Sequence, residues 1–193
     1  MNRSGLMTVA EVYSPRRTFT AVWWLYQVIA VFAGSALIAL SAQLEIMLPF
    51  SPVPITGQTF SVLLIAALLG RVRGTAAVLA YLAEGTTGLP VFAGGAAGVG
   101  YVFGPTGGYL IGFLPAAFVV GALAEHGWDR NVFLTGLCMA LGSVVCFAAG
   151  LAWLSVFVGW EYVLPLGLYP FIAGDILKIT AAAALLPALR RFV

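Results

Sequence analysis

Residues 20–43 read TAVWWLYQVIAVFAGSALIALSAQ and contain no charged side chain. A transmembrane helix needs about 20 consecutive apolar residues, so this stretch predicts a helix that crosses a bilayer unaided. The rest of the 193-residue chain has a similar character: 62% of all residues are hydrophobic, 8% are charged, and the mean hydropathy is +1.04. A soluble domain carries about 25% charged residues. The composition therefore excludes a cytosolic globular enzyme, and its hydrophobicity excludes a disordered chain.

Five further apolar segments follow the first. The predicted spans cover residues 20–43, 55–70, 74–85, 107–124, 132–158 and 167–189. The second and third are short, and a re-entrant hairpin made of both would leave four true crossings. Such a hairpin would place Arg71 and Arg73 at its buried tip, where a charge costs about 2.5 kcal/mol or more. The sequence therefore favours an all-α integral membrane protein with a bundle of six transmembrane helices.

Outside the predicted spans, basic residues lie in the two terminal segments and in every second connection. They are Arg3, Arg16, Arg17, Arg71, Arg73, Arg130, Arg190 and Arg191. The alternate connections contain Glu45, Glu84 and Glu161 and no Lys or Arg. Because cytoplasmic loops are enriched in Lys and Arg, we expect both termini in the cytoplasm. Residues 1–19 are then a cytoplasmic N-terminal segment, and residues 20–193 form a single transmembrane domain.

Two connections on the predicted outer side have an unusual composition. Residues 48–58 contain three prolines, which fix φ and remove backbone donors, so this segment is expected to be stiff and extended. Residues 84–106 are rich in glycine yet remain apolar. Irregular backbone at membrane depth is tolerated only where protein buries it or where it lines a cavity. We interpret the two segments as lids over an outward-facing ligand cavity, with flexible connectors as the alternative.

The last predicted span contains two opposite charges, Asp175 and Lys178, the latter being the only lysine in the chain. A spacing of three residues places both on one helical face. Ionisable residues inside a membrane are costly and face a cavity or each other. The functional hypothesis is a polar recognition point, where Asp175 accepts N–H bonds from a ligand and Lys178 donates to a carbonyl or carboxylate. The alternative is a structural pair whose charges neutralise each other.

Other polar and aromatic candidates carry weaker signals. Gln58, at the start of the second span, either points its amide into the same cavity or simply begins the helix. Tyr109 and Phe92 are able to stack on a ligand ring, although aromatic residues near the interface also anchor spans. Small residues repeat at spacings of four between Ala30 and Ala39. They allow close helix approach, within the chain or against another membrane protein.

Four sequence blocks together resemble the BioY family. They are Ser51-Pro-Val-Pro-Ile-Thr-Gly-Gln-Thr59 followed by Leu69-Gly70, Gly88-Leu-Pro-Val-Phe-Ala-Gly-Gly95, Gly104-Pro-Thr-Gly-Gly-Tyr-Leu110 and Gly174-Asp-Ile-Leu-Lys178. Members of this family are substrate-binding S-components of energy-coupling factor (ECF) vitamin transporters, with biotin as ligand. The resemblance implies a six-helix fold in the bacterial cytoplasmic membrane, with an outward cavity capped by the 1–2 and 3–4 loops. It also implies a transmembrane coupling subunit and two ATPase subunits as partners.

The resemblance further implies that Asp175 and Lys178 contact the ureido ring of biotin, and that Gly94 and Gly95 belong to the cap. This agrees with the chemistry, because a ureido group offers two N–H donors and one carbonyl acceptor.

Two positions depart from the pattern of some family members. An Asn that can follow the cap glycines is Ala96 here, and an Arg that can follow the Gly-Gly-Tyr motif is Leu110. The partner of the biotin carboxylate is therefore open between backbone N–H groups, a hydroxyl such as that of Thr106, and water.

The sequence is compatible with three classes of function to different degrees. The first is high-affinity binding and uptake of biotin, or of another small vitamin, as a transport subunit. The second is an intramembrane enzyme with Asp175 and Lys178 as an acid–base pair, and it is disfavoured because the spans hold no histidine and no nucleophile beside a base. The third is a membrane scaffold without a ligand. No cofactor or metal is expected, and the net charge of +2 is too small to indicate a nucleic-acid partner.

Overall fold

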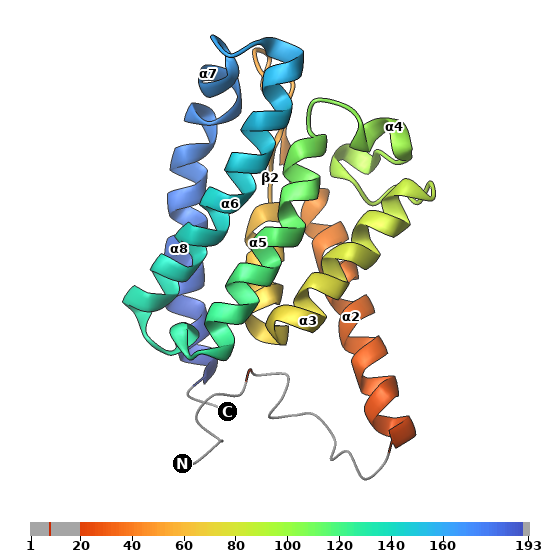
Figure 1. Cartoon of the computed structure of the whole chain (residues 1–193), viewed down its shortest axis with the longest axis vertical. Coiled ribbons are helices and arrows are strands. Elements are labelled where there is room, and N and C mark those ends of the chain that lie inside the picture. The colour runs from red at the N-terminus through yellow and green to blue at the C-terminus, as the bar shows by residue number, and fades with distance from the viewer. Residues whose placement is uncertain (1–7, 9–19, 191–193) are drawn as a thin grey trace.

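The structure, a computed structural model, describes residue 8 and residues 20–190. Apart from Thr8, the predicted cytoplasmic segment 1–19 lies outside the described residues. The elements follow in the order α2 (Thr20–Ala42), β1 (Glu45–Ile46), β2 (Ile55–Thr56), α3 (Gln58–Thr86), η2 (Ala93–Gly95), α4 (Val99–Val102), α5 (Gly107–Glu125), η3 (Trp128–Arg130), α6 (Val132–Val158), α7 (Val163–Gly167) and α8 (Tyr169–Arg190) (Figure 1).

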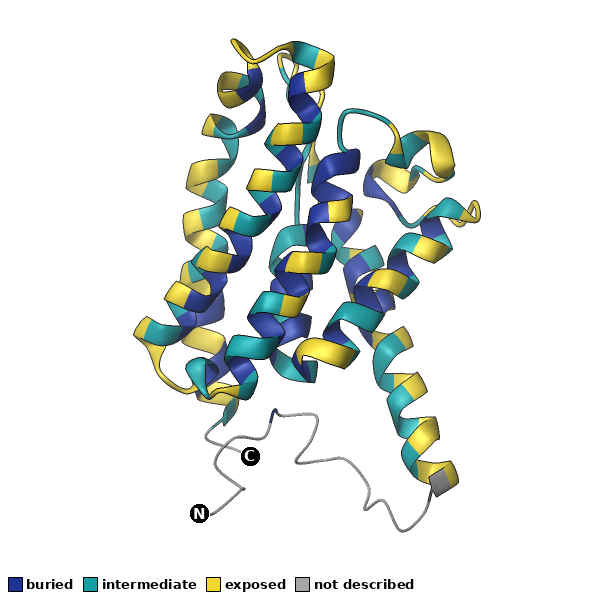
Figure 2. Cartoon of the chain, viewed as in Figure 1, coloured by how far each residue is buried: buried dark blue, intermediate teal, exposed yellow. Residues whose placement is uncertain are grey.

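Within the described residues, five helices are long and apolar enough to cross a membrane: α2, α3, α5, α6 and the pair α7–α8. Exposed residues form stripes along the outward sides of these helices (Figure 2). Many of the exposed side chains are large and apolar, among them Trp24, Phe133 and Val156. An apolar exterior of this extent suits lipid rather than water. The predicted all-helical membrane architecture is confirmed, with a two-stranded hairpin of two residues per strand as a small addition.

The sequence predicts six spans where the structure has five helices of membrane length, and the difference lies in α3. This helix is interrupted at Gly70, whose φ of 82° and ψ of 174° are not helical. Gln58 donates a hydrogen bond to the hydroxyl of Tyr81. In a straight helix these residues would be about 35 Å apart, at 1.5 Å per residue. Helix α3 therefore folds back on itself, with one arm on each side of Gly70 (Figure 1).

The bend of α3 is fixed by the end of α5. The carboxylate of Glu125 accepts a hydrogen bond from the backbone N–H of Arg71 at 2.9 Å and pairs with the Arg71 guanidinium at 3.2 Å. Gly121 lies so close to this bend that a methyl group there would overlap the Arg71 backbone. The glycine on α5 therefore lets the bend and α5 approach to backbone contact.

Helix α2 lies beside the second arm of α3 (Figure 1). A methyl group at Gly34 would come within 2.9 Å of Ala77 Cβ. The hydroxyl of Ser35 donates to Glu84 at 2.6 Å. At least the central part of the small-residue repeat thus packs within the chain.

The two ends of the bundle differ. One, here called the loop end, carries the β-hairpin, the cap (residues 87–106) and the connection 159–168. The other, the bend end, carries the α3 bend, η3 and the last residues of α8 (Figure 1). The hairpin pairs Glu45 with Thr56 and Ile46 with Ile55. Its proline-rich turn is held to α7, because the Ser51 hydroxyl donates to the Leu166 carbonyl at 2.7 Å.

We predict that Gly70→Ala destabilises the protein by about 1–3 kcal/mol, because a side chain disfavours positive φ and its Cβ would lie 2.7 Å from Glu125 Oε1. The apparent Tm in detergent should fall by several degrees. Gly136→Ala is the matched control, since its new methyl group would meet only Ala183 Cβ, at 3.9 Å. An unchanged Tm for Gly70→Ala would contradict this account of the bend.

Candidate functional site

A cavity opens at the loop end between the hairpin, the cap and helices α3, α5, α6 and α8. It holds about 600 Å³ of space, its opening included. Its lining residues are Val53, Pro54, Thr56, Gln58, Thr59, Ala93, Tyr101, Thr106, Tyr109, Leu110, Phe113, Cys146, Phe147, Phe171, Asp175 and Lys178. Ligand sites typically have mostly apolar walls with a few placed polar groups. This cavity fits that description.

Asp175 and Lys178 both line the cavity, and each has its own protein partner. Lys178 Nζ donates to the backbone carbonyl of Thr56 at 2.8 Å, and the Ser143 hydroxyl donates to Asp175 Oδ1 at 3.2 Å. Among the described residues, no ion pair within 4.0 Å joins the two side chains. An ammonium carries three donors and a carboxylate about four acceptor sites. Both groups therefore keep hydrogen-bonding capacity for a molecule in the cavity.

Gln58 and Tyr109 also line the cavity, and their polar atoms are engaged by the protein. Gln58 is buried; it donates to Tyr81 and accepts from the Thr56 hydroxyl at 3.1 Å. The Tyr109 hydroxyl donates to the Gly167 carbonyl at 2.8 Å. These bonds fix the two side chains as wall elements, with the second amide hydrogen of Gln58 left over.

The other predicted site residues, Phe92, Gly94 and Gly95, belong to the cap and do not line the cavity. Phe92 is completely buried and does not line the cavity. Gly94 and Gly95 lie in η2 with φ of 64° and 72°. Gly94 borders a neighbouring hollow at the mouth, where the carboxylate of Glu45 lies against it. Within η2, Ala93 reaches the cavity.

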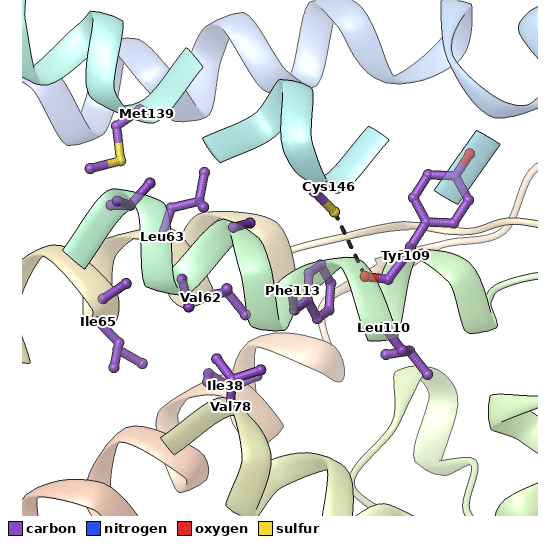
Figure 3. Close-up of a cluster of buried hydrophobic side chains, with 14 of the residues drawn as sticks. Ile38, Val62, Leu63, Ile65, Val78, Tyr109, Leu110, Phe113, Met139 and Cys146 are labelled. Atoms are coloured by element: carbon purple, nitrogen blue, oxygen red, sulfur yellow. Dashed lines mark hydrogen bonds between the residues drawn. The ribbon is translucent and has the colours of Figure 1, made fainter. Parts of the chain in front are cut away.

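The aromatic wall was not singled out from the sequence. Phe113, Phe147 and Phe171 line the cavity next to Tyr109, with ring centroids of the last two 6.2 and 6.5 Å from that of Tyr109. Figure 3 shows Tyr109 and Phe113 on α5 beside Cys146 of α6, whose thiol donates to the Tyr109 carbonyl at 3.7 Å. A usable signal was spacing: Phe171 precedes Asp175 by four residues, which puts both on one helical face.

The cap contributes hydroxyl groups at the mouth of the cavity. Tyr101 and Thr106 both line it. Burial raises the pKa of Tyr101 above its ordinary value, and the nearby Thr106 side chain opposes that rise. Tyr101 therefore remains a neutral hydroxyl near neutral pH. Leu110 lies in the same wall.

Comparisons with known proteins agree with this architecture. The model of the BioY family matches residues 5–193. A probable biotin transporter BioY of Pyrococcus horikoshii is 39% identical over 147 residues, covering 76% of this chain and 85% of that protein. The biotin transporter BioY of Thermotoga maritima is 38% identical over 166 residues, covering 86% and 96%. The crystal structure of the S-component for biotin from an ECF-type ABC transporter superposes with a TM-score of 0.77 at 28% identity, covering 87% of this chain and 92% of that one.

Proposed function

The chain belongs to the BioY family, and from this premise we propose that it binds biotin and takes it up through the bacterial cytoplasmic membrane as the S-component of an ECF transporter. It is a transport protein and not an enzyme. The observation that carries the proposal is the cavity itself, in which one carboxylate and one ammonium stand in an otherwise uncharged wall.

The proposed contacts follow from complementary chemistry. The ureido ring of biotin has two N–H donors, which Asp175 is suited to accept, and one carbonyl, which Lys178 is suited to bind. Hydrogen bonds to charged groups are shorter and stronger than neutral ones. The phenylalanine wall offers apolar surface for the rest of the ring system, and burial of that surface adds to binding.

We propose that the two arms of α3 are separate crossings, which makes six. The side chain of Arg71 is 51% exposed and pairs with Glu125 at the end of α5, a helix of full membrane length. This supports a bend at the membrane surface rather than a buried re-entrant tip. Arg130 and Arg190 lie at the same bend end, so the positive-inside rule favours a cytoplasmic bend end and an outward loop end. On this arrangement both termini are cytoplasmic.

The proposed partners follow from the structural likeness to an S-component. They are a transmembrane coupling subunit and two ATPase subunits, which would supply the energy for uptake. We also propose a single transmembrane domain over residues 20–193 and a cytoplasmic segment over residues 1–19, and another small vitamin is the alternative ligand.

We predict that the detergent-purified protein binds biotin one-to-one by calorimetric titration. Asp175→Asn and Lys178→Met should each weaken binding by about 10- to 100-fold, because a hydrogen bond to a charged group contributes about 1.5–3 kcal/mol. Thr180→Val is the matched control on α8, since Thr180 is exposed and bonds only to its own helix. If titration with biotin shows no binding and titration with another vitamin does, that vitamin is the ligand. Unchanged affinity in both charge variants would remove the pair from the site.

The small number of charged groups in the cavity lining leads to a second prediction. Asp175 and Lys178 are the only charged side chains among the described lining residues. If the ureido ring occupies both, the biotin carboxylate meets only neutral donors such as Thr106. A neutral hydrogen bond contributes about 0.5–1.5 kcal/mol, so biotin methyl ester should bind within about tenfold of biotin. A loss of 100-fold or more on esterification would mean that the carboxylate binds Lys178 instead.

Cysteine labelling tests the six-crossing arrangement. In a Cys138→Ala/Cys146→Ala background, Trp160→Cys should react with a membrane-impermeant maleimide added to intact cells, because Trp160 is 76% exposed at the loop end. Val72→Cys at the α3 bend and His126→Cys should react only after permeabilisation. A Val72→Cys thiol that stays unreactive in permeabilised cells would favour the re-entrant hairpin.

A further inference from the structure

Phe92 fills a socket beneath the cap. Its side chain is 0% exposed, although it belongs to an irregular segment of the loop end. The floor of the socket is Gly85 on the second arm of α3, where a methyl group would overlap the Phe92 ring. The backbone closes the socket, since the N–H of Gly98 donates to the Gly85 carbonyl at 2.7 Å. The cap is therefore docked on α3 through one aromatic side chain.

The ring of Phe92 contacts residues that support two parts of the cavity wall. Its face is stacked on Tyr101, with centroids 5.2 Å apart and planes at 16°. It meets Tyr81 edge-on, with centroids 5.5 Å apart and planes at 83°. Tyr101 lines the cavity directly, and Tyr81 holds the lining residue Gln58 by a hydrogen bond. Movement of Phe92 would therefore release both walls.

The backbone of Phe92 is tied on two sides as well. Its N–H donates to the Ala96 carbonyl at 3.0 Å, which closes the glycine turn of η2. Its carbonyl accepts from the side-chain amide of Gln43 at 3.2 Å, at the end of α2. The ring, the turn and α2 thus meet at one residue.

We propose that Phe92 is a positioning residue that anchors the closed cap and sets how fast a bound ligand leaves. It does so without touching the ligand, because Tyr101 and Gln58 line the cavity and Phe92 does not. This proposal rests on the proposed function, since the ligand used to test it is biotin.

The test is the dissociation rate of radiolabelled biotin from the full-length protein in detergent. Gly85→Ala puts a methyl group into the socket and should speed dissociation by about tenfold or more, with a smaller change in the association rate. Alanine is a better helix former than glycine, so faster dissociation in this variant cannot come from a weakened helix. Gly136→Ala is the control and should leave the rate unchanged, because its methyl group meets only Ala183 at 3.9 Å.

A pair of compensating substitutions shows whether Phe92 acts through its packing on Gly85 or through direct contact with the ligand. Phe92→Leu alone should speed dissociation by roughly threefold to tenfold, since a smaller side chain leaves the socket partly empty. Because leucine leaves room for the new methyl group, the double variant Gly85→Ala/Phe92→Leu should dissociate more slowly than Gly85→Ala. Additive losses in the double variant, or an unchanged rate in Gly85→Ala, would overturn the proposal while leaving biotin binding intact. Absence of biotin binding by the wild-type protein would overturn the proposed function and this inference together.

Discussion

A carboxylate and an ammonium on one face of an apolar helix need polar partners that lipid cannot supply, and the loop end of this protein is arranged around that need. Lys178 donates to the Thr56 carbonyl at 2.8 Å, and Asp175 accepts from the Ser143 hydroxyl at 3.2 Å. The first contact requires β2 to pass beside α8, although 122 residues of sequence separate the two groups. With β2 fixed there, α3 begins at Gln58 in the cavity wall.

Close approach of backbones gives this arrangement its rigidity. The missing side chain of Gly121 lets the bend of α3 pack against α5, and that of Gly34 lets α2 pack against α3. The missing side chain of Gly85 leaves space for the Phe92 ring. Protein interiors are packed at crystal-like density, so each contact has little room to relax. The inner wall is built on long helices, whereas short elements of the hairpin and the cap line the mouth. A binding subunit that must both retain and release its ligand benefits from this division.

The helices were predictable because hydrophobic length is a direct consequence of bilayer thickness. The fold-back inside α3 was predictable only as two short spans, since hydropathy does not report the positive φ of Gly70. Asp175 and Lys178 stood out because charge in an apolar span is costly. Phe147 and Phe171 did not stand out, because the sequence does not distinguish an apolar residue that lines a cavity from the many that do not. Phe92 was considered able to stack on a ligand ring, and only the tertiary structure reveals that its face meets Tyr101 and its edge meets Tyr81.

The most direct test of the central claim is a crystal structure of the protein grown with biotin. We expect the ureido nitrogens within hydrogen-bond distance of the Asp175 carboxylate, and the ureido oxygen within that distance of Lys178 Nζ, about 2.7–3.2 Å. A complex in which the ureido ring lies elsewhere, while Asp175 and Lys178 keep only Ser143 and Thr56 as partners, would contradict it.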